Sequence, residues 1–216
     1  MGEHAFGDAE RRAVYRAIFE RRDMRRFVPD TKVPPDALAR ILQAAHAAPS
    51  VGLMQPWRFI RITDDGLRHR IHALVNHERL RTAEALGQRD DEFLALKVEG
   101  ILACAELIVV ALGEGRDEHV FGRRTMPQMD LASAACAIQN VWLAARSEGY
   151  GVGWVSLFEP ADLARLLGMP AGAEPIAILC LGEVPEFPDR PQLELDHWAF
   201  ARPLSEFVFE NGWVSN

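Results

Sequence analysis

Four arginines surround a single carboxylate in residues 21–27, which read Arg-Arg-Asp-Met-Arg-Arg-Phe and are called the arginine stretch below. Arginine binds phosphate through two parallel hydrogen bonds and keeps its charge at any working pH. The arginine stretch therefore predicts a site for an anionic group. The alternative is a solvated helix end, where the cations only complement the helix dipole.

The sequence contains few other patterns that are typical of a catalytic or metal site. The closely spaced glycines of residues 149–153 follow a helix and precede a strand, the reverse of a dinucleotide-binding fingerprint, and indicate a turn. His69 and His72 lie on a charged helix without a third convergent ligand, so we expect no metal site. Ser50 and Ser156 lack a nucleophile elbow, and no hydrolase triad can be assembled from the spacing.

Composition limits the possible partners and compartment. The chain has 216 residues, is 49% hydrophobic and carries a net charge of -7, which argues against nucleic acid or an anionic membrane as a partner. Its three cysteines lie in apolar segments without metal-binding spacing, which favours a reducing compartment, and we expect the cytoplasm. The longest apolar run, residues 101–112, is too short to span a bilayer.

Hydrophobic periodicity predicts the elements that must position these residues. Helices are expected over residues 8–21, 36–48, 130–148 and 162–167, and strands over residues 57–62, 105–112, 152–155 and 175–184. Residues 116–128 are expected to form a loop. The helix over residues 130–148 is apolar nearly all round, which is typical of a central helix. No repeat or linker divides the chain, so residues 1–216 are expected to form one α+β domain.

Two further segments, residues 66–100 and the tail from Pro185, have features of their own. Residues 66–100 are helical, charged and weakly amphipathic, with Gly87 as a break between two helices. This segment is either a lid or a solvated helical hairpin. The tail from Pro185 is rich in proline and aromatic residues, and residues 207–209 could form an arm.

The order of several motifs is similar to that of the FMN-dependent nitroreductase family. These motifs run from the arginine stretch to a late arginine, Arg202. Five longer segments resemble the subgroup of the BluB type, which makes 5,6-dimethylbenzimidazole: RRDMRRFVP, HAAPSVGLMQPWRFIRIT, RRTMPQMDLASAACAIQN, GWVSLFEP and CLGEVPEFPDRPQLE. The resemblance implies a central mixed, mainly antiparallel sheet flanked by helices, with a helical lid.

The resemblance also implies which residues contact FMN. They are Arg21, Arg22, Asp23, Met24, Arg25, Ser50, Ser156, Leu157 and Arg202. The arginines of the stretch would hold the FMN phosphate and ribityl chain, and Arg202 would complete the phosphate site. Ser50 and the loop after it would border the cofactor. Ser156 and Leu157 would lie beside the isoalloxazine ring.

Two departures from ordinary nitroreductases agree with the dimethylbenzimidazole-forming subgroup. Those enzymes carry a small residue such as serine at the position of Asp23, and asparagine at the position of Leu53. In the subgroup, reduced FMN is a substrate that fragments with oxygen to dimethylbenzimidazole and erythrose 4-phosphate. We expect Asp23 to act as the general base, because a carboxylate among arginines can accept protons in steps. Ser156 would hydrogen-bond the flavin edge.

Two other functions remain open at this point. One is an NAD(P)H-dependent flavin oxidoreductase or nitroreductase of the wider family. The other is a non-catalytic flavin-binding protein, in which a carboxylate at the phosphate end would have no clear use. The resemblance further implies a homodimer with flavin at the interface, molecular oxygen as a co-substrate and a separate reductase that supplies reduced FMN.

Overall fold

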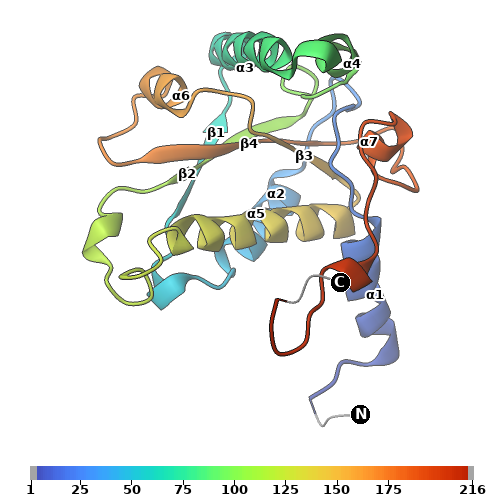
Figure 1. Cartoon of the computed structure of the whole chain (residues 1–216), viewed down its shortest axis with the longest axis vertical. Helices are drawn as coiled ribbons and strands as arrows, with labels where there is room; N and C mark the ends of the chain where they lie inside the picture. Colours follow the sequence, from blue (N-terminus) through green and yellow to red (C-terminus); the bar gives the residue numbers. More distant parts are fainter. Residues whose placement is uncertain (1–3, 214–216) are drawn as a thin grey trace.

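An antiparallel sheet of four strands forms the centre of the protein (Figure 1). The computed structural model describes residues 4–213. The strands are β1 (Trp57–Ile62), β2 (Glu106–Leu112), β3 (Gly151–Val155) and β4 (Glu174–Gly182), and their order across the sheet is β1-β2-β4-β3. All four predicted strands are confirmed within two residues at each end.

The registers of the strands bring the arginine stretch to one edge of the sheet. Trp57 pairs with Leu112 between β1 and β2, and Gly151 pairs with Gly182 between β3 and β4. At the outer edge of β3, Asp23 forms an isolated parallel bridge with Val152. The predicted sheet, mixed and mainly antiparallel, is therefore confirmed.

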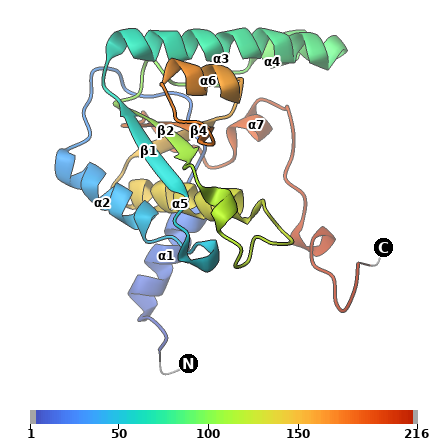
Figure 2. The same ribbon diagram turned by 90° about the vertical axis from the view of Figure 1, so that its left-hand side faces the viewer.

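Helices cover both faces of this sheet (Figures 1 and 2). They are α1 (Asp8–Glu20), α2 (Pro35–His46), α3 (Asp65–Leu86), α4 (Asp90–Ala95), α5 (Met129–Ser147), α6 (Pro160–Leu166) and α7 (Gln192–Leu195). Short 3-10 helices occupy Val51–Leu53, Gly87–Arg89, Arg116–Glu118 and Leu204–Glu206. None of the helices among residues 4–213 is long and apolar enough to cross a membrane.

Successive side chains of each strand point to opposite faces of the sheet, and they contribute to a hydrophobic cluster on each face. In β2, Leu107 and Val109 point to the face covered by α3 and α6, while Ile108 and Val110 point to the face covered by α2 and α5. On the first face, Ile71 and Val75 of α3 are fully buried. The helix α3 therefore belongs to the core layer of the protein.

The helix α5 is buried on one face only. Ala134, Ile138 and Val141 are fully buried against the sheet and α2, whereas Leu131 is 46% exposed and Cys136 is also exposed. Within one chain, the burial expected of a central helix is therefore found only on the face of α5 that packs against the sheet and α2. Its outer face presents small and apolar side chains to the surface.

A buried ion cluster fixes the loop over residues 116–128 to the start of α5. Asp130 Oδ2 accepts hydrogen bonds from Arg116 Nε at 2.9 Å and Arg123 Nη2 at 3.0 Å. The side chains of Asp130 and Arg123 are only 7% and 8% exposed. Because charges this deeply buried need partners, the cluster holds the otherwise irregular loop in one position.

The variant Asp130→Ala is expected to lower the free energy of unfolding by about 3–5 kcal/mol, because it leaves two buried guanidinium groups without their shared carboxylate. Urea unfolding followed by circular dichroism measures the change. Asp117→Ala is the matched control, since the Asp117 side chain is fully exposed and its pair with Arg123 is long at 3.5 Å. A loss below 1 kcal/mol for Asp130→Ala would contradict the expectation.

Candidate flavin site

The arginine stretch lies alongside β3 because its backbone continues the sheet. The helix α1 ends at Glu20, and Arg21 already has extended backbone angles. The backbone N–H of Met24 then donates to the carbonyl of Val152 at 2.9 Å. The residues before and after Met24 are Asp23 and Arg25, and the side chains of both bind the backbone of Trp154 on β3.

Glycines on β3 make this close approach possible. A Cβ atom at Gly153 would lie 2.0 Å from the carbonyl oxygen of Met24, and one at Gly151 would lie 2.8 Å from Met24 Cγ. The turn predicted for these glycines applies to Gly149, which has a φ of +89°. The other two glycines allow the arginine stretch to pack on the strand, which the spacing alone did not indicate.

A cavity of about 630 Å³, called the larger cavity below, opens beside the arginine stretch. Its walls come from the end of α1, the arginine stretch, residues 93–98, residues 154–157 and residues 191–198. Side chains that carry charge are present on three of these walls: Arg21, Arg22, Asp23, Arg25, Lys97 and Asp196. Its volume falls within the range of about 300–1,000 Å³ that is usual for small-molecule sites.

The arginines of the stretch have different surroundings. Arg25 binds the carboxylate of Asp23 and donates from Nη2 to the carbonyl of Trp154 at 2.8 Å, and its Nη1 is buried without a partner among the described residues. Arg21 lies over the ring of Trp142, 5.3 Å from its centroid. A ligand acceptor in the larger cavity could therefore satisfy Arg25.

Arg22 makes its hydrogen bonds to the backbone. Its Nη1 donates to the carbonyls of Phe19 at 2.7 Å and Arg21 at 2.8 Å, and its Nη2 donates to the carbonyl of Asp189 at 2.5 Å. Although it lines the larger cavity, this side chain ties the end of α1 to the C-terminal part of the chain. Its contribution to the site is to position the neighbouring groups.

Asp23 is held at two points and still faces the cavity. Its Oδ1 accepts from the backbone N–H of Trp154 at 2.9 Å, and its Oδ2 pairs with Arg25. Removal from water raises the pKa of Asp23 above its ordinary value and outweighs the lowering effects of Arg25, the Trp154 N–H and Arg21. The side chain remains 43% exposed. Asp23 is therefore an accessible carboxylate with increased proton affinity.

The structure brings together most of the residues that the resemblance implied. Ser156 and Leu157 line the larger cavity together with Arg21, Arg22, Asp23 and Arg25. The side chain of Met24, within the arginine stretch, is only 7% exposed, and it lines a second cavity that adjoins the larger one. Met24 is thus mainly a packing residue.

Ser50 and Arg202 are not among the residues that line the larger cavity. Ser50 precedes the 3-10 helix Val51–Leu53, and its Oγ accepts from the N–H of Gln55 at 3.0 Å. Arg202 is exposed and pairs with Glu206 on the same turn. Within one chain, these two residues therefore lie outside the larger cavity, and the flavin contacts implied for them stay predictions.

The C-terminal strap, residues 185–198, closes one side of the site. Arg22 binds its carbonyl at Asp189, and Trp198 packs on Phe93 with a centroid distance of 6.1 Å. The guanidinium carbon of Arg89 lies 3.7 Å from the centroid of the Trp198 ring. Sequence reasoning missed this wall and noted only that the tail from Pro185 is rich in proline and aromatic residues.

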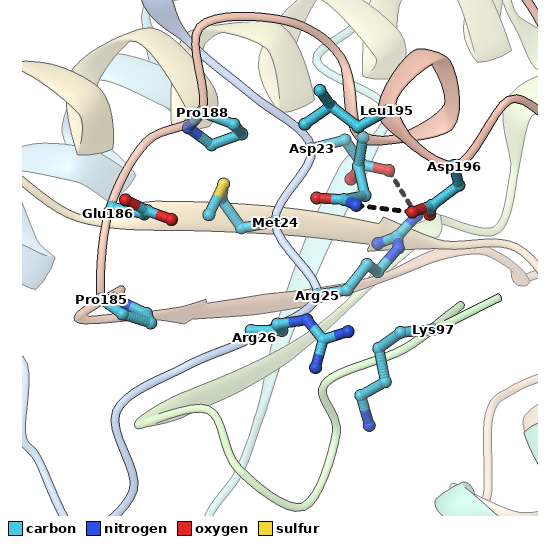
Figure 3. A pocket seen from close by; sticks show the side chains of 11 residues that line it. Asp23, Met24, Arg25, Arg26, Lys97, Pro185, Glu186, Pro188, Leu195 and Asp196 are labelled. Atoms are coloured by element: carbon cyan, nitrogen blue, oxygen red, sulfur yellow. Dashed lines mark hydrogen bonds and ion pairs between the residues drawn. The ribbon is translucent and has the colours of Figure 1, made fainter.

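A cavity of about 310 Å³, called the smaller cavity below, adjoins the larger one beneath the strap (Figure 3). It shares with the larger cavity Asp23, Arg25, Lys97, Gln192 and Asp196. Its other walls are formed by Met24, Arg26, Pro185, Glu186, Pro188 and Leu195. The side chains of Asp23 and Arg25 therefore lie at the boundary between two spaces.

Comparison with known proteins identifies the group to which this fold and site belong. The model of the Nitroreductase family matches residues 18–183. The chain belongs to the nitroreductase family. This match confirms the family resemblance and spans the arginine stretch and all four strands of the sheet.

Individual relatives within the nitroreductase family are also similar over most of their length. The 5,6-dimethylbenzimidazole synthase of Rhodospirillum rubrum is 38% identical over 192 residues, which cover 87% of this chain and 90% of that protein. A BluB-like flavoprotein from Clostridium difficile has a TM-score of 0.70 at 20% identity, with 92% of this chain and 99% of that chain covered. Iodotyrosine deiodinase bound to FMN and 3-iodo-L-tyrosine also has a TM-score of 0.70, at 21% identity, with 93% of this chain and 100% of that chain covered. These two structural similarities support the fold.

Proposed function

We propose that this protein is a 5,6-dimethylbenzimidazole synthase, which uses oxygen to fragment reduced FMN into dimethylbenzimidazole and erythrose 4-phosphate. The product would supply the lower ligand of cobalamin. The observation that carries the proposal is Asp23, an accessible carboxylate held between Arg25 and the Trp154 N–H in the larger cavity. The Rhodospirillum rubrum relative, which has this name, supports the same reaction.

The residues of the larger cavity fit FMN as the bound group. Arg21 and Arg25 provide positive charge for the phosphate or the polar edge of the ring, and Arg25 Nη1 is buried and still needs an acceptor. Ser156 and Leu157 offer a polar and an apolar contact on the opposite wall. When bound, reduced flavin supplies the electrons for oxygen and the carbon skeleton of the product.

In this proposal Asp23 is the general base. Its raised pKa makes it a stronger base than an ordinary aspartate, and Arg25 and the Trp154 N–H keep its oxygens in fixed positions. Ser156 donates a hydrogen bond to the flavin edge. Arg22 keeps the arginine stretch and the C-terminal strap together through its carbonyl contacts, so that water has limited access to the cavity.

A homodimer would complete the site. Ser50 and Arg202 lie outside the larger cavity of their own chain, and exposed apolar side chains gather on α1, on α5 and near the C-terminus. They include Val14, Tyr15, Ile18, Phe19, Leu131, Phe200, Leu204, Phe207, Val208 and Trp213. A second copy of the chain would cover these side chains and would bring in a Ser50 loop and an Arg202 of its own.

The lid predicted over residues 66–100 is proposed in a narrower form. The helix α3 is part of the core through Ile71 and Val75, whereas residues 93–98 line the larger cavity. The covering part of this segment would therefore be α4 and the residues that follow it. A separate flavin reductase is a further part of the proposal, because the reaction consumes flavin that must arrive reduced.

One experiment tests the proposed function directly. The purified protein is mixed with chemically reduced FMN in air, and the products are separated by liquid chromatography with mass detection. The expected result is dimethylbenzimidazole in place of an equal amount of flavin. Recovery of all flavin as yellow FMN would contradict the proposal, and catalytic oxidation of NAD(P)H with the flavin intact would favour the oxidoreductase alternative.

The variant Arg25→Leu is expected to weaken binding of reduced FMN by about 100-fold, because it removes a charge-assisted contact and leaves Asp23 without its partner. Anaerobic fluorescence titration measures the dissociation constant. Arg26→Leu is the matched control: Arg26 lies on the same stretch but lines only the smaller cavity, and a change below threefold is expected. Equal losses in both variants would contradict a specific contact from Arg25.

A further inference from the structure

A second carboxylate, Asp196, occupies the boundary between the two cavities. It lies at the end of α7 in the C-terminal strap and lines both the larger and the smaller cavity, as Asp23 does. Figure 3 shows the carboxylates of Asp23 and Asp196 both turned toward the guanidinium of Arg25. Two acidic side chains from segments far apart in the sequence therefore face the same cation.

Hydrogen bonds hold Asp196 in this orientation. Gln192 Nε2 donates to Asp196 Oδ1 at 2.8 Å, and the backbone N–H of Asp196 donates to the carbonyl of Gln192 at 2.9 Å. Among the described residues, the second carboxylate oxygen of Asp196 accepts no hydrogen bond. Asp196 is exposed, so a proton that reaches it can pass to bulk water.

A base that acts more than once in a reaction must lose each proton that it accepts. Arg25 and the backbone of Trp154 hold the two oxygens of Asp23, and a substrate in the larger cavity would cover the 43% of this side chain that is otherwise exposed. Asp23 also lines the smaller cavity, which a substrate in the larger cavity would leave free for water. Water in a space of about 310 Å³ that several charged side chains line can link carboxylates that are not in direct contact.

We infer that Asp196 is the proton acceptor that returns Asp23 to its ionised form during the reaction, through water in the smaller cavity. The O–H bond on Asp23 breaks, the proton moves through water to a carboxylate oxygen of Asp196, and Asp196 releases it to solvent. No electrons are transferred in these steps. The inference rests on the proposed function, in which Asp23 is the general base.

The charged neighbours of Asp196 are consistent with this role. Those that share a cavity with it are Arg21, Arg22, Asp23, Arg25, Arg26, Lys97 and Glu186. Five of these seven groups are cations, so the space that Asp196 shares with Asp23 is lined mainly by positive charge. Arg25 pairs with Asp23, and the carboxylate of Asp196 is turned toward the same guanidinium.

The test uses Asp196→Asn, which keeps an oxygen for the hydrogen bond from Gln192. At low buffer concentration, dimethylbenzimidazole formation is expected to slow by about 100-fold, the lower end of the usual contribution of a proton-transfer group. Added imidazole at constant ionic strength is expected to restore the rate, because a small base can replace the missing acceptor. The wild-type rate should not depend on imidazole, and neither should that of Asp91→Asn, an exposed carboxylate outside both cavities.

A second measurement needs no flavin. Titration of the Asp23 carboxyl by ¹³C NMR is expected to give a lower pKa in Asp196→Asn than in the wild-type protein, because a nearby like charge has been removed. A wild-type rate for Asp196→Asn, a slow rate that imidazole does not restore, or an unchanged Asp23 pKa would each overturn the inference. If the wild-type protein makes no dimethylbenzimidazole, it is the proposed function that fails, and the Asp23 titration still tests the pairing of the two carboxylates.

Discussion

Replacement of Asp23 by asparagine is expected to lower the rate of dimethylbenzimidazole formation by about 100- to 10,000-fold, the usual contribution of a positioned general base. Asparagine has nearly the same shape, and its oxygen can still accept the hydrogen bond from the Trp154 N–H. It cannot accept a proton at any working pH. Product formation from reduced FMN under single-turnover conditions measures the effect.

The binding of reduced FMN separates loss of catalysis from loss of the site. We expect the dissociation constant of Asp23→Asn to stay within about tenfold of the wild-type value, because Arg25 keeps its bond to the Trp154 carbonyl. Asp30→Asn, an exposed carboxylate in the same segment, is the control and should be fully active. Product at the wild-type rate from Asp23→Asn would show that another group is the base.

The raised pKa of Asp23 also predicts the direction of two pH effects. Activity should fall as the pH decreases through the pKa of Asp23, and the midpoint should lie above that of an ordinary aspartate. Stability should change in the opposite direction. Because the folded state binds this proton more tightly than the unfolded state, the contribution of Asp23 to stability is fully present below its unfolded pKa and is lost as the pH rises through its folded pKa. Asp23→Asn should remove both effects.

The variant Gly153→Ala is expected to be the most damaging single-methyl change at the site. The added Cβ would lie 2.0 Å from the Met24 carbonyl oxygen and 2.8 Å from Arg25 Nη1, so the arginine stretch must move away from β3. We expect a loss of about 3 kcal/mol or more in the free energy of unfolding, at the upper end of overpacking effects. Thermal and urea unfolding measure the loss.

The same variant should also lose the binding of reduced FMN, since displacement of the stretch breaks the contacts of Arg25 and Asp23 with Trp154. Gly66→Ala is the control, because this glycine lies in α3 without a positive φ, and the nearest atom to an added Cβ is Oδ1 of the N-cap residue Asp64 at 3.3 Å. Alanine there should leave binding unchanged and stabilise the helix by up to about 1 kcal/mol. Tight flavin binding by Gly153→Ala would show that the stretch tolerates the methyl group.

The sequence by itself determined the regular elements and the cluster of charges. Apolar side chains at a spacing of three and four predicted α1, α2 and α5, and short apolar runs predicted the strands, because the pattern that buries one face of an element is local. The arginine stretch was also visible, since its charged residues are neighbours in the chain. The family resemblance then singled out Asp23.

Only the tertiary structure decided what each of these residues does. Arg22 lines the larger cavity, where its predicted cofactor contact stays a prediction, and its guanidinium also binds the carbonyl of Asp189, 167 residues away. Asp23 obtains its orientation from Trp154, 131 residues away, and the approach of the two segments depends on Gly153. The C-terminal strap, which closes one side of the cavity, has no hydrophobic periodicity from which that position could be predicted. Contacts over such separations depend on how the sheet and helices pack, which local sequence patterns do not encode.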